Sequence, residues 1–98
     1  HLISFTSLKI GSDKVNVIKF NKREINTIAV GTDQGIQIWD YLKGEVLVNL
    51  KYPCISLTFS PDGKKIAAVG LLRSKIKYWE VRTGRRIKKL AAGFSTGN

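Results

Sequence analysis

The side chains that could carry out catalysis or hold a metal are few in this sequence and widely separated. Its only histidine is His1 and its only cysteine is Cys54, so neither a zinc site nor a Cys/His nucleophile pair can be assembled within the chain. The serines have no internal histidine to serve as the base of a catalytic triad. We therefore predict that the chain is not an enzyme, with no catalytic residues, no metal site and no cofactor.

The segment from Gly31 to Gly35 has a glycine at each end, as phosphate-binding loops do. Such a loop must follow a strand and open a helix. Here apolar residues alternate on both sides of the segment, which predicts a strand before it and another after it. We therefore interpret this segment as a turn between strands.

Positive charge is concentrated in the second half of the chain. The net charge is +10, and residues 51–98 hold eleven Lys and Arg side chains against two acidic ones. Like charges summed over a surface raise its potential and attract anionic partners. The predicted basic patch consists of Lys75, Lys77, Arg82, Arg85, Arg86, Lys88 and Lys89.

Two interpretations of this basic patch are open. Either it faces an acidic partner, which is RNA or a protein, or it is a solvated outer strand whose charges prevent aggregation at a sheet edge. No aromatic residues alternate with the basic ones at residues 85–89, so base stacking is not supported. Any RNA contact there would be made to phosphates, without sequence preference and with a steep dependence on salt.

The elements that must position these side chains are predicted to be short strands. The composition, 43% hydrophobic and 24% charged, is ordinary for a globular protein. Apolar residues alternate over short runs, as at Val15 and Val17 and again at Ile36 and Ile38, with the two-residue period of a strand. Turn-forming residues separate the runs at Asn21 to Glu24, Asp33 to Gly35, Lys43 to Gly44, Ser60 to Gly63 and Thr83 to Gly84.

This pattern of strands and turns occurs twice. Phe20 and Phe59 are 39 residues apart, and Trp39 and Trp79 are 40 residues apart. A fixed period of about 40 residues is typical of a propeller blade, which contains four antiparallel strands. We therefore predict an all-β fold with four short antiparallel strands in each repeat.

Both repeats resemble the WD-repeat family of β-propellers. In the second repeat the resemblance is carried by Phe59 to Gly63, Ile66 to Gly70 and Ile76 to Gly84, and in the first by Ile36 to Asp40. It covers roughly residues 11–92. The resemblance implies about two four-stranded blades, with Trp39 and Trp79 packed between neighbouring blades.

We expect four segments: the outer strand of a preceding blade at 1–10, one blade at 11–50, a second blade at 51–92, and a tail toward a next blade at 93–98. In the first segment, Leu2, Phe5 and Leu8 show the same spacing as Ile87 and Leu90 in the last predicted strand. A blade has two apolar faces and cannot cover both alone. Together with the absence of methionine, this predicts a segment of a larger propeller.

The sequence departs from the family in the polar network that WD repeats often build around a histidine. In the family, this histidine bonds an aspartate in the turn between the second and third strands. Asp33 occupies that turn in the first repeat, but His1 is the only histidine, and Leu71 to Lys75 replaces the turn in the second repeat without an acid. We therefore expect these blades to be less rigid than regular members.

The family resemblance implies that the turns between second and third strands, and the linkers between blades, form a rim that receives partners. Leu71, Leu72 and Arg73 lie on this rim by alignment, and Tyr52 lies in the linker. Two leucines in an exposed turn suggest a protein contact. Each assignment has an alternative, which is packing onto a neighbouring blade for the leucines and local packing for Tyr52. Cys54 is expected to be a buried core thiol.

Taken as a whole, the sequence predicts a non-catalytic protein–protein interaction scaffold within a larger protein or assembly, with other protein subunits as partners. The alternative is an RNA-associated component of a ribonucleoprotein. A third interpretation is an enzyme whose active site lies in other blades. The apolar runs are too short to cross a bilayer, and a lone cysteine fits a reducing compartment, so we expect an intracellular location.

Overall fold

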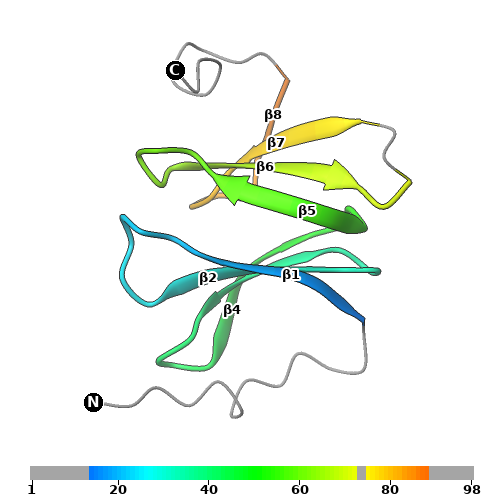
Figure 1. Ribbon diagram of the computed structural model, residues 1–98. Coiled ribbons are helices and arrows are strands. Elements are labelled where there is room, and N and C mark those ends of the chain that lie inside the picture. The colour runs from blue at the N-terminus through cyan, green and yellow to red at the C-terminus, as the bar shows by residue number, and fades with distance from the viewer. Residues whose placement is uncertain (1–13, 73–74, 89–98) are drawn as a thin grey trace.

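A computed structural model gives the structure of the chain and describes residues 14–72 and 75–88. These residues form strands and turns, without a helix, and the strands make two four-stranded antiparallel sheets. The two sheets are stacked, with β1 and β5 running side by side (Figure 1). The prediction of an all-β fold with four antiparallel strands in each repeat is confirmed.

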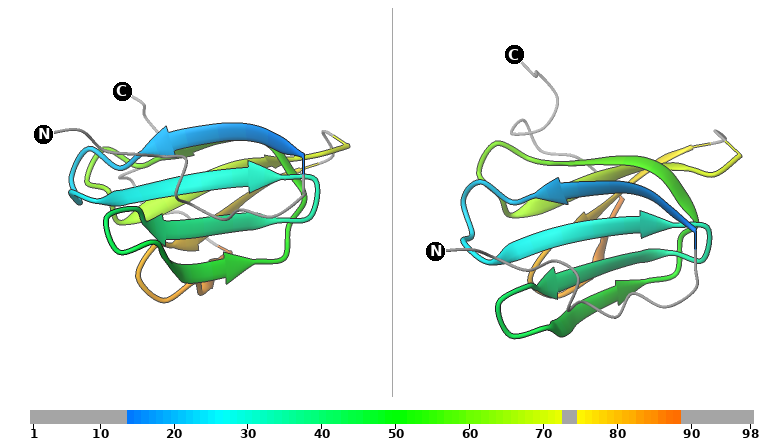
Figure 2. Two further views of the ribbon diagram at one scale, coloured as in Figure 1. Left: turned by 90° about the horizontal axis from the view of Figure 1, so that it is seen from below. Right: turned by 60° about the horizontal axis from the view of Figure 1, so that its bottom comes forward.

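Each sheet follows the order of the strands in the chain. The first sheet consists of β1 (Val15–Phe20), β2 (Thr27–Thr32), β3 (Ile36–Asp40) and β4 (Glu45–Leu50). The second consists of β5 (Cys54–Phe59), β6 (Lys65–Gly70), β7 (Ile76–Glu80) and β8 (Arg86–Ile87). Figure 2 shows the meander of the first sheet, in which β1 and β4 are the two edges. The predicted strand at 1–10 and the tail at 93–98 lie outside the described residues.

The turns form where the sequence places turn-forming residues. Ser60 begins the turn between β5 and β6, and its hydroxyl donates a hydrogen bond of 2.6 Å to the Asp62 carboxylate. That carboxylate also accepts the N–H of Lys64 at 2.9 Å. These two hydrogen bonds, the one from Ser60 above all, lower the pKa of Asp62. Gly63 completes the turn at a φ of 74°, a conformation that L side chains adopt only under strain.

The first strand of each sheet, β1 or β5, carries a β-bulge at the same position of the repeat. Because β1 and β5 run side by side, we call them the inner strands. In the first sheet the register shifts between Val15 and Val17, and in the second it shifts between Cys54 and Ser56. Asn16 and Ile55 are therefore the inserted residues. A bulge bends its strand and redirects the inserted side chain, so these two positions are set apart from the regular alternation.

The main core lies between the two sheets. Side chains that alternate along β2 and β3 contribute Ala29, Ile36 and Ile38, which are fully buried. Leu50 of β4 also belongs to this cluster. The second sheet and the turn after β7 contribute Cys54, Leu57, Ile66, Ala68, Trp79 and Val81. Burial of apolar surface between the sheets is the main force holding them together.

A second, smaller cluster lies on the opposite face of the first sheet. Ile28, Val30 and Trp39 are buried there, with Tyr41 packed against them. The two tryptophans therefore differ in position, because Trp79 lies between the two described sheets whereas Trp39 lies on the face turned away from the second sheet. The family-based expectation of packing between sheets holds for Trp79 within the described part of the chain.

Candidate partner-binding surface

The linker between the two sheets, residues 51–53, lies against the turn that joins β6 and β7. The N–H of Leu71 donates a hydrogen bond of 2.9 Å to the carbonyl of Pro53, and the N–H of Gly70 bonds to the carbonyl of Lys75 at 3.2 Å. We call this region, where the linker and the β6–β7 turn meet, the linker end of the sheets. It brings together the predicted partner-binding residues Tyr52, Leu71 and Leu72, while Arg73 lies outside the described residues.

Tyr52 connects the linker to the second sheet by a hydrogen bond and by ring packing. Its hydroxyl donates a hydrogen bond of 2.6 Å to the carbonyl of Lys75, and its ring centroid lies 5.3 Å from that of Trp79. The ring also faces the Lys77 ammonium, which lies 4.7 Å from its centroid. Gly70 leaves room for the phenol, because a Cβ at that position would approach the hydroxyl oxygen to 2.6 Å. These contacts give Tyr52 the local packing role, while its contact with a partner stays a prediction.

Leu71 and Leu72 are exposed at the linker end, with 36% and 87% of their surface accessible. The backbone of Leu71 is held by Pro53, so the turn presents both side chains from an anchored position. An apolar pair on an anchored turn suits a protein contact better than the same pair on an unanchored loop. The anchored backbone loses less conformational entropy when a partner binds. The assignment of this pair to partner binding stays a prediction.

The basic residues do not form one continuous patch. Lys75 and Lys77 lie at the start of β7, whereas Arg82 and Arg85 follow its other end. A five-residue strand spans roughly 13 Å, which exceeds a Debye length at physiological ionic strength. Two separate groups of charge therefore replace the single run expected from the sequence, and Lys89 lies outside the described residues.

The outer strand β8 is shorter than predicted, because within the described residues it contains Arg86 and Ile87 alone. Arg85 closes the turn instead, since its carbonyl accepts the N–H of Glu80 at 2.9 Å and its own N–H bonds to the Thr83 hydroxyl at 3.1 Å. Arg86 and Lys88 are exposed beyond this turn. If the basic patch is interpreted as an outer strand, the structure places Arg86 in that strand and Arg85 and Lys88 outside it.

One of these basic side chains is paired. The Arg85 guanidinium lies 3.4 Å from the Glu80 carboxylate, and both groups are well exposed to solvent. A hydrogen bond from the Thr83 hydroxyl, together with the charge of Arg85, lowers the pKa of Glu80. Because exposed pairs contribute little to stability, we assign this pair the role of ordering the turn.

Asn16 is a connecting residue that the sequence analysis missed. Its amide nitrogen donates one hydrogen bond of 2.8 Å to the Asp33 carboxylate and another of 2.9 Å to the carbonyl of Cys54. Asp33 thus obtains a hydrogen-bond partner within the first sheet, and the same amide joins the first sheet to the second. An asparagine inside a predicted strand was the available signal, because this residue is depleted in strands.

Asn21 makes a second connection at the opposite end of the sheets. Its amide nitrogen donates a hydrogen bond of 2.9 Å to the carbonyl of Gly63, and its amide oxygen accepts the N–H groups of Arg23 and Glu24. Asn21 is buried. Within the described residues, no buried side-chain nitrogen or oxygen lacks a hydrogen-bond partner. The buried polar side chains of the described residues are therefore satisfied by Asn16, Asn21 and the turn residues, and the expectation of reduced rigidity stays a prediction.

Cys54 is fully buried at the start of β5, as predicted. Burial raises the pKa of its thiol to about 11, an effect that a hydrogen bond with the Ser56 backbone only partly offsets. The thiol is thus kept neutral and enclosed in the folded chain.

We expect Cys54 to react with a thiol reagent such as dithionitrobenzoate at pH 8 about 100-fold more slowly in the folded chain than in urea, because the thiolate is the nucleophile. The absorbance of the thionitrobenzoate released in the reaction measures both rates. The raised pKa also means that the thiol stabilises the fold below about pH 9, and that this contribution is lost as the pH rises toward 11. Equal rates in the two conditions would show that Cys54 is accessible.

Residues 14–72 and 75–88 contain no group of three His, Cys, Asp or Glu side chains that could hold a metal ion. They also contain no helix that could span a membrane. No family model matches this sequence, and a search of curated proteins finds no matching relative.

Proposed function

We propose that the chain is a non-catalytic protein–protein interaction scaffold, built as a segment of a WD-type β-propeller. The observation that carries this proposal is the equivalence of the faces of the two sheets. Each outer face corresponds, position by position, to a face that is buried between the two sheets.

The outer face of the second sheet repeats the buried face of the first. Ile36 and Ile38 are fully buried against the second sheet, and the equivalent residues 40 positions later are Ile76 and Tyr78. Ile76 is 56% exposed. A side chain that is buried in one repeat and half exposed in the next supports a further sheet on that face.

The outer face of the first sheet corresponds in turn to the buried face of the second. Ile66 and Trp79 pack toward the first sheet, and their equivalents Ile28 and Trp39 face away from the second. Each sheet thus has one face of each kind, which is the alternation of faces that head-to-tail addition of sheets requires. On the outer face of the first sheet, Ile28, Val30 and Trp39 are already buried. A heterologous, head-to-tail arrangement generates a ring when the rotation closes.

The packing of the sheets also supports a ring. The inner strand β5 lies closest to β1 and β2, so the sheets approach most nearly at their inner strands and diverge outward. Figure 1 shows β1 and β5 adjacent along this inner side. Blades packed around a central channel have this wedge arrangement.

The alternative is an RNA-associated role for the basic residues. Arg82, Arg86 and Lys88 are exposed, which suits contact with phosphates. The separation of the basic residues into two groups at opposite ends of β7 favours a protein partner, because a backbone-tracking RNA site needs continuous positive charge.

The proposed assembly is tested by sedimentation velocity on the 98-residue chain at low salt. We expect the chain to associate, because the outer face of the second sheet leaves Ile76 56% exposed and a further copy would cover it. Replacing Ile76 with glutamate should shift the distribution toward monomer by about tenfold in the association constant, since a charge would be buried in the contact.

The matched control is Ile25→Glu, which makes the same substitution at a turn residue that is 82% exposed. It should leave the association unchanged. A stable, folded monomer in the unmodified chain would overturn the proposal, and so would equal effects of the two substitutions.

A further inference from the structure

A cavity of about 320 Å³ opens between the inner strands β1 and β5, at the end of the sheets opposite the linker. Three cationic side chains, Lys19, Lys22 and Arg23, line it from the first sheet. The second sheet contributes Thr58, Phe59 and Pro61. The site is separate from the linker end and from the basic residues of β7 and β8.

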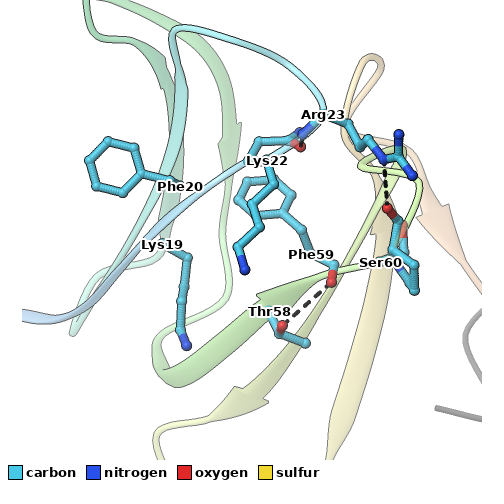
Figure 3. Close-up of a pocket in the computed structure, with 9 residues that line it drawn as sticks. Lys19, Phe20, Lys22, Arg23, Thr58, Phe59 and Ser60 are labelled. Carbon is cyan, nitrogen blue, oxygen red and sulfur yellow. Dashed lines mark hydrogen bonds between the residues drawn. The ribbon is translucent and has the colours of Figure 1, made fainter. Parts of the chain in front are cut away.

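The fold aims the cations into this cavity. Lys19 lies two residues after Val17, which packs against the core between the sheets, so strand alternation turns Lys19 toward the second sheet. Lys22 and Arg23 follow in the β1–β2 turn, and Figure 3 shows the Lys22 side chain extending past the Phe59 ring toward Thr58, with the Lys19 side chain extending in the same general direction. The Arg23 Nε donates a hydrogen bond of 3.2 Å to the carbonyl of Pro61, which ties the two walls together.

No acidic side chain balances these cations. Within the described residues, none of the three forms an ion pair, and no carboxylate lines the cavity. Glu24 lines a different cavity between the sheets, and the Asp62 carboxylate is engaged by Ser60 and by the N–H of Lys64. The cavity therefore carries a local positive charge that attracts an oxyanion.

The remaining walls favour a peptide over a nucleic acid. Phe59 is half buried against the core, so it provides an apolar floor rather than an open ring face for base stacking. The adjoining strands β1 and β5 are both sheet edges. Edge strands present unpaired backbone groups to which an extended peptide can bond, while its side chains enter adjacent pockets.

We propose that this cavity binds an acidic side chain of an extended peptide segment from a partner protein, with Lys19 and Lys22 pairing with the carboxylate. An apolar side chain two positions along the peptide, which lies on the same face of the extended chain, rests on Phe59. The inference deepens the proposed function, and rests on it for the premise that the chain binds proteins. It identifies a binding site that the high charge of the second half of the sequence does not predict.

Fluorescence anisotropy on the 98-residue chain tests the proposal with a labelled peptide in which glutamate and valine take turns at every second position, separated by serine, so that both lie on one face of the extended peptide. The double substitution Lys19→Glu and Lys22→Glu should weaken binding about tenfold, because two exposed ion pairs are replaced by repulsion. The matched control is Lys14→Glu with Lys43→Glu, which changes the net charge equally at exposed positions outside both the cavity and the linker. The control should weaken binding about twofold or less. Circular dichroism confirms that each variant is folded.

A second peptide with glutamine in place of glutamate, and a labelled oligouridine, complete the test. Equal weakening in the two double variants, or equal binding of the glutamine peptide, would overturn the proposal. Tighter binding of the RNA, lost in the cavity variant, would overturn it in favour of a nucleic-acid site. The sedimentation of the unmodified chain is measured separately, so failure of this site is distinguishable from failure of the proposed assembly.

Discussion

Replacing Trp79 with alanine is expected to lower the free energy of unfolding by about 3–5 kcal/mol. Trp79 is 6% exposed and belongs to the core between the sheets, where its ring also packs against Tyr52. Its removal leaves a cavity at the contact that holds both sheets and the linker. Because domains of this size are stable by only about 5–15 kcal/mol, the variant should be close to unfolding at room temperature.

Urea denaturation followed by the fluorescence of Trp39 measures this loss. Leu72→Ala is the control, because Leu72 is 87% exposed and its truncation should change stability by about 0.5 kcal/mol or less. A loss below about 1 kcal/mol for Trp79→Ala would contradict the described packing of the two sheets. A change in cooperativity without a change in midpoint would mean that the sheets unfold separately.

Replacing Asn21 with alanine is expected to cost about 2–3 kcal/mol, although the change removes little apolar surface. The substitution leaves the carbonyl of Gly63 and the N–H groups of Arg23 and Glu24 without the partners that Asn21 supplies. Since Asn21 is buried, water replaces these hydrogen bonds poorly. Thermal unfolding followed by circular dichroism measures the loss.

Two further variants separate the contributions of Asn21. Asn21→Asp keeps an oxygen acceptor for the turn but loses the donor to Gly63, so it isolates the bond between the sheets and should cost about 1–2 kcal/mol. Ser60→Ala is the matched control at the same place in the second repeat, where the hydroxyl bonds within its own turn. If Asn21→Ala costs no more than Ser60→Ala, the bond from Asn21 to Gly63 does not hold the sheets together.

The sequence predicted the strands well because their pattern is local. Alternation at Ile36 and Ile38, and turn chemistry at Ser60 to Gly63, depend on neighbouring residues alone. The recurrence of Trp39 at Trp79 gave the register of the two repeats, and both tryptophans pair with the equivalent residue of the preceding strand in the structure. Whether the sheets belong to a WD-type propeller stays a proposal.

The parts of the candidate surface that depend on contact between sheets could not be predicted. The bulge at Asn16 redirects its amide toward Cys54 and Asp33. No pattern of neighbouring residues predicts this bulge or its two hydrogen bonds. Tyr52 was left between two roles because its neighbours Trp79 and Lys77 are distant in sequence.

Counting net charge over each half of the chain did not predict the cationic cavity, and it suggested a more continuous basic patch than the structure contains. Lys19 and Lys22 lie in the half of the chain that is nearly neutral as a whole, yet the fold gathers them with Arg23 and leaves the nearby acids outside. Conversely, the basic residues that cluster in the sequence around β7 are separated by the length of the strand. Net charge describes a segment, whereas binding depends on the charges that share a surface.

The closer approach of the sheets at β1 and β5 sets a curvature for any longer stack. If every further sheet were added with the same divergence, each would turn the stack by the same angle, and the number of sheets that completes a circle would follow from that angle alone. The outer spacing is governed in part by Gly84, where a Cβ would lie 2.7 Å from a methyl carbon of Val48. The methyl group of an alanine in place of Gly84 would therefore push the outer strands apart. This would change the angle between successive sheets and with it the number of sheets that completes a circle.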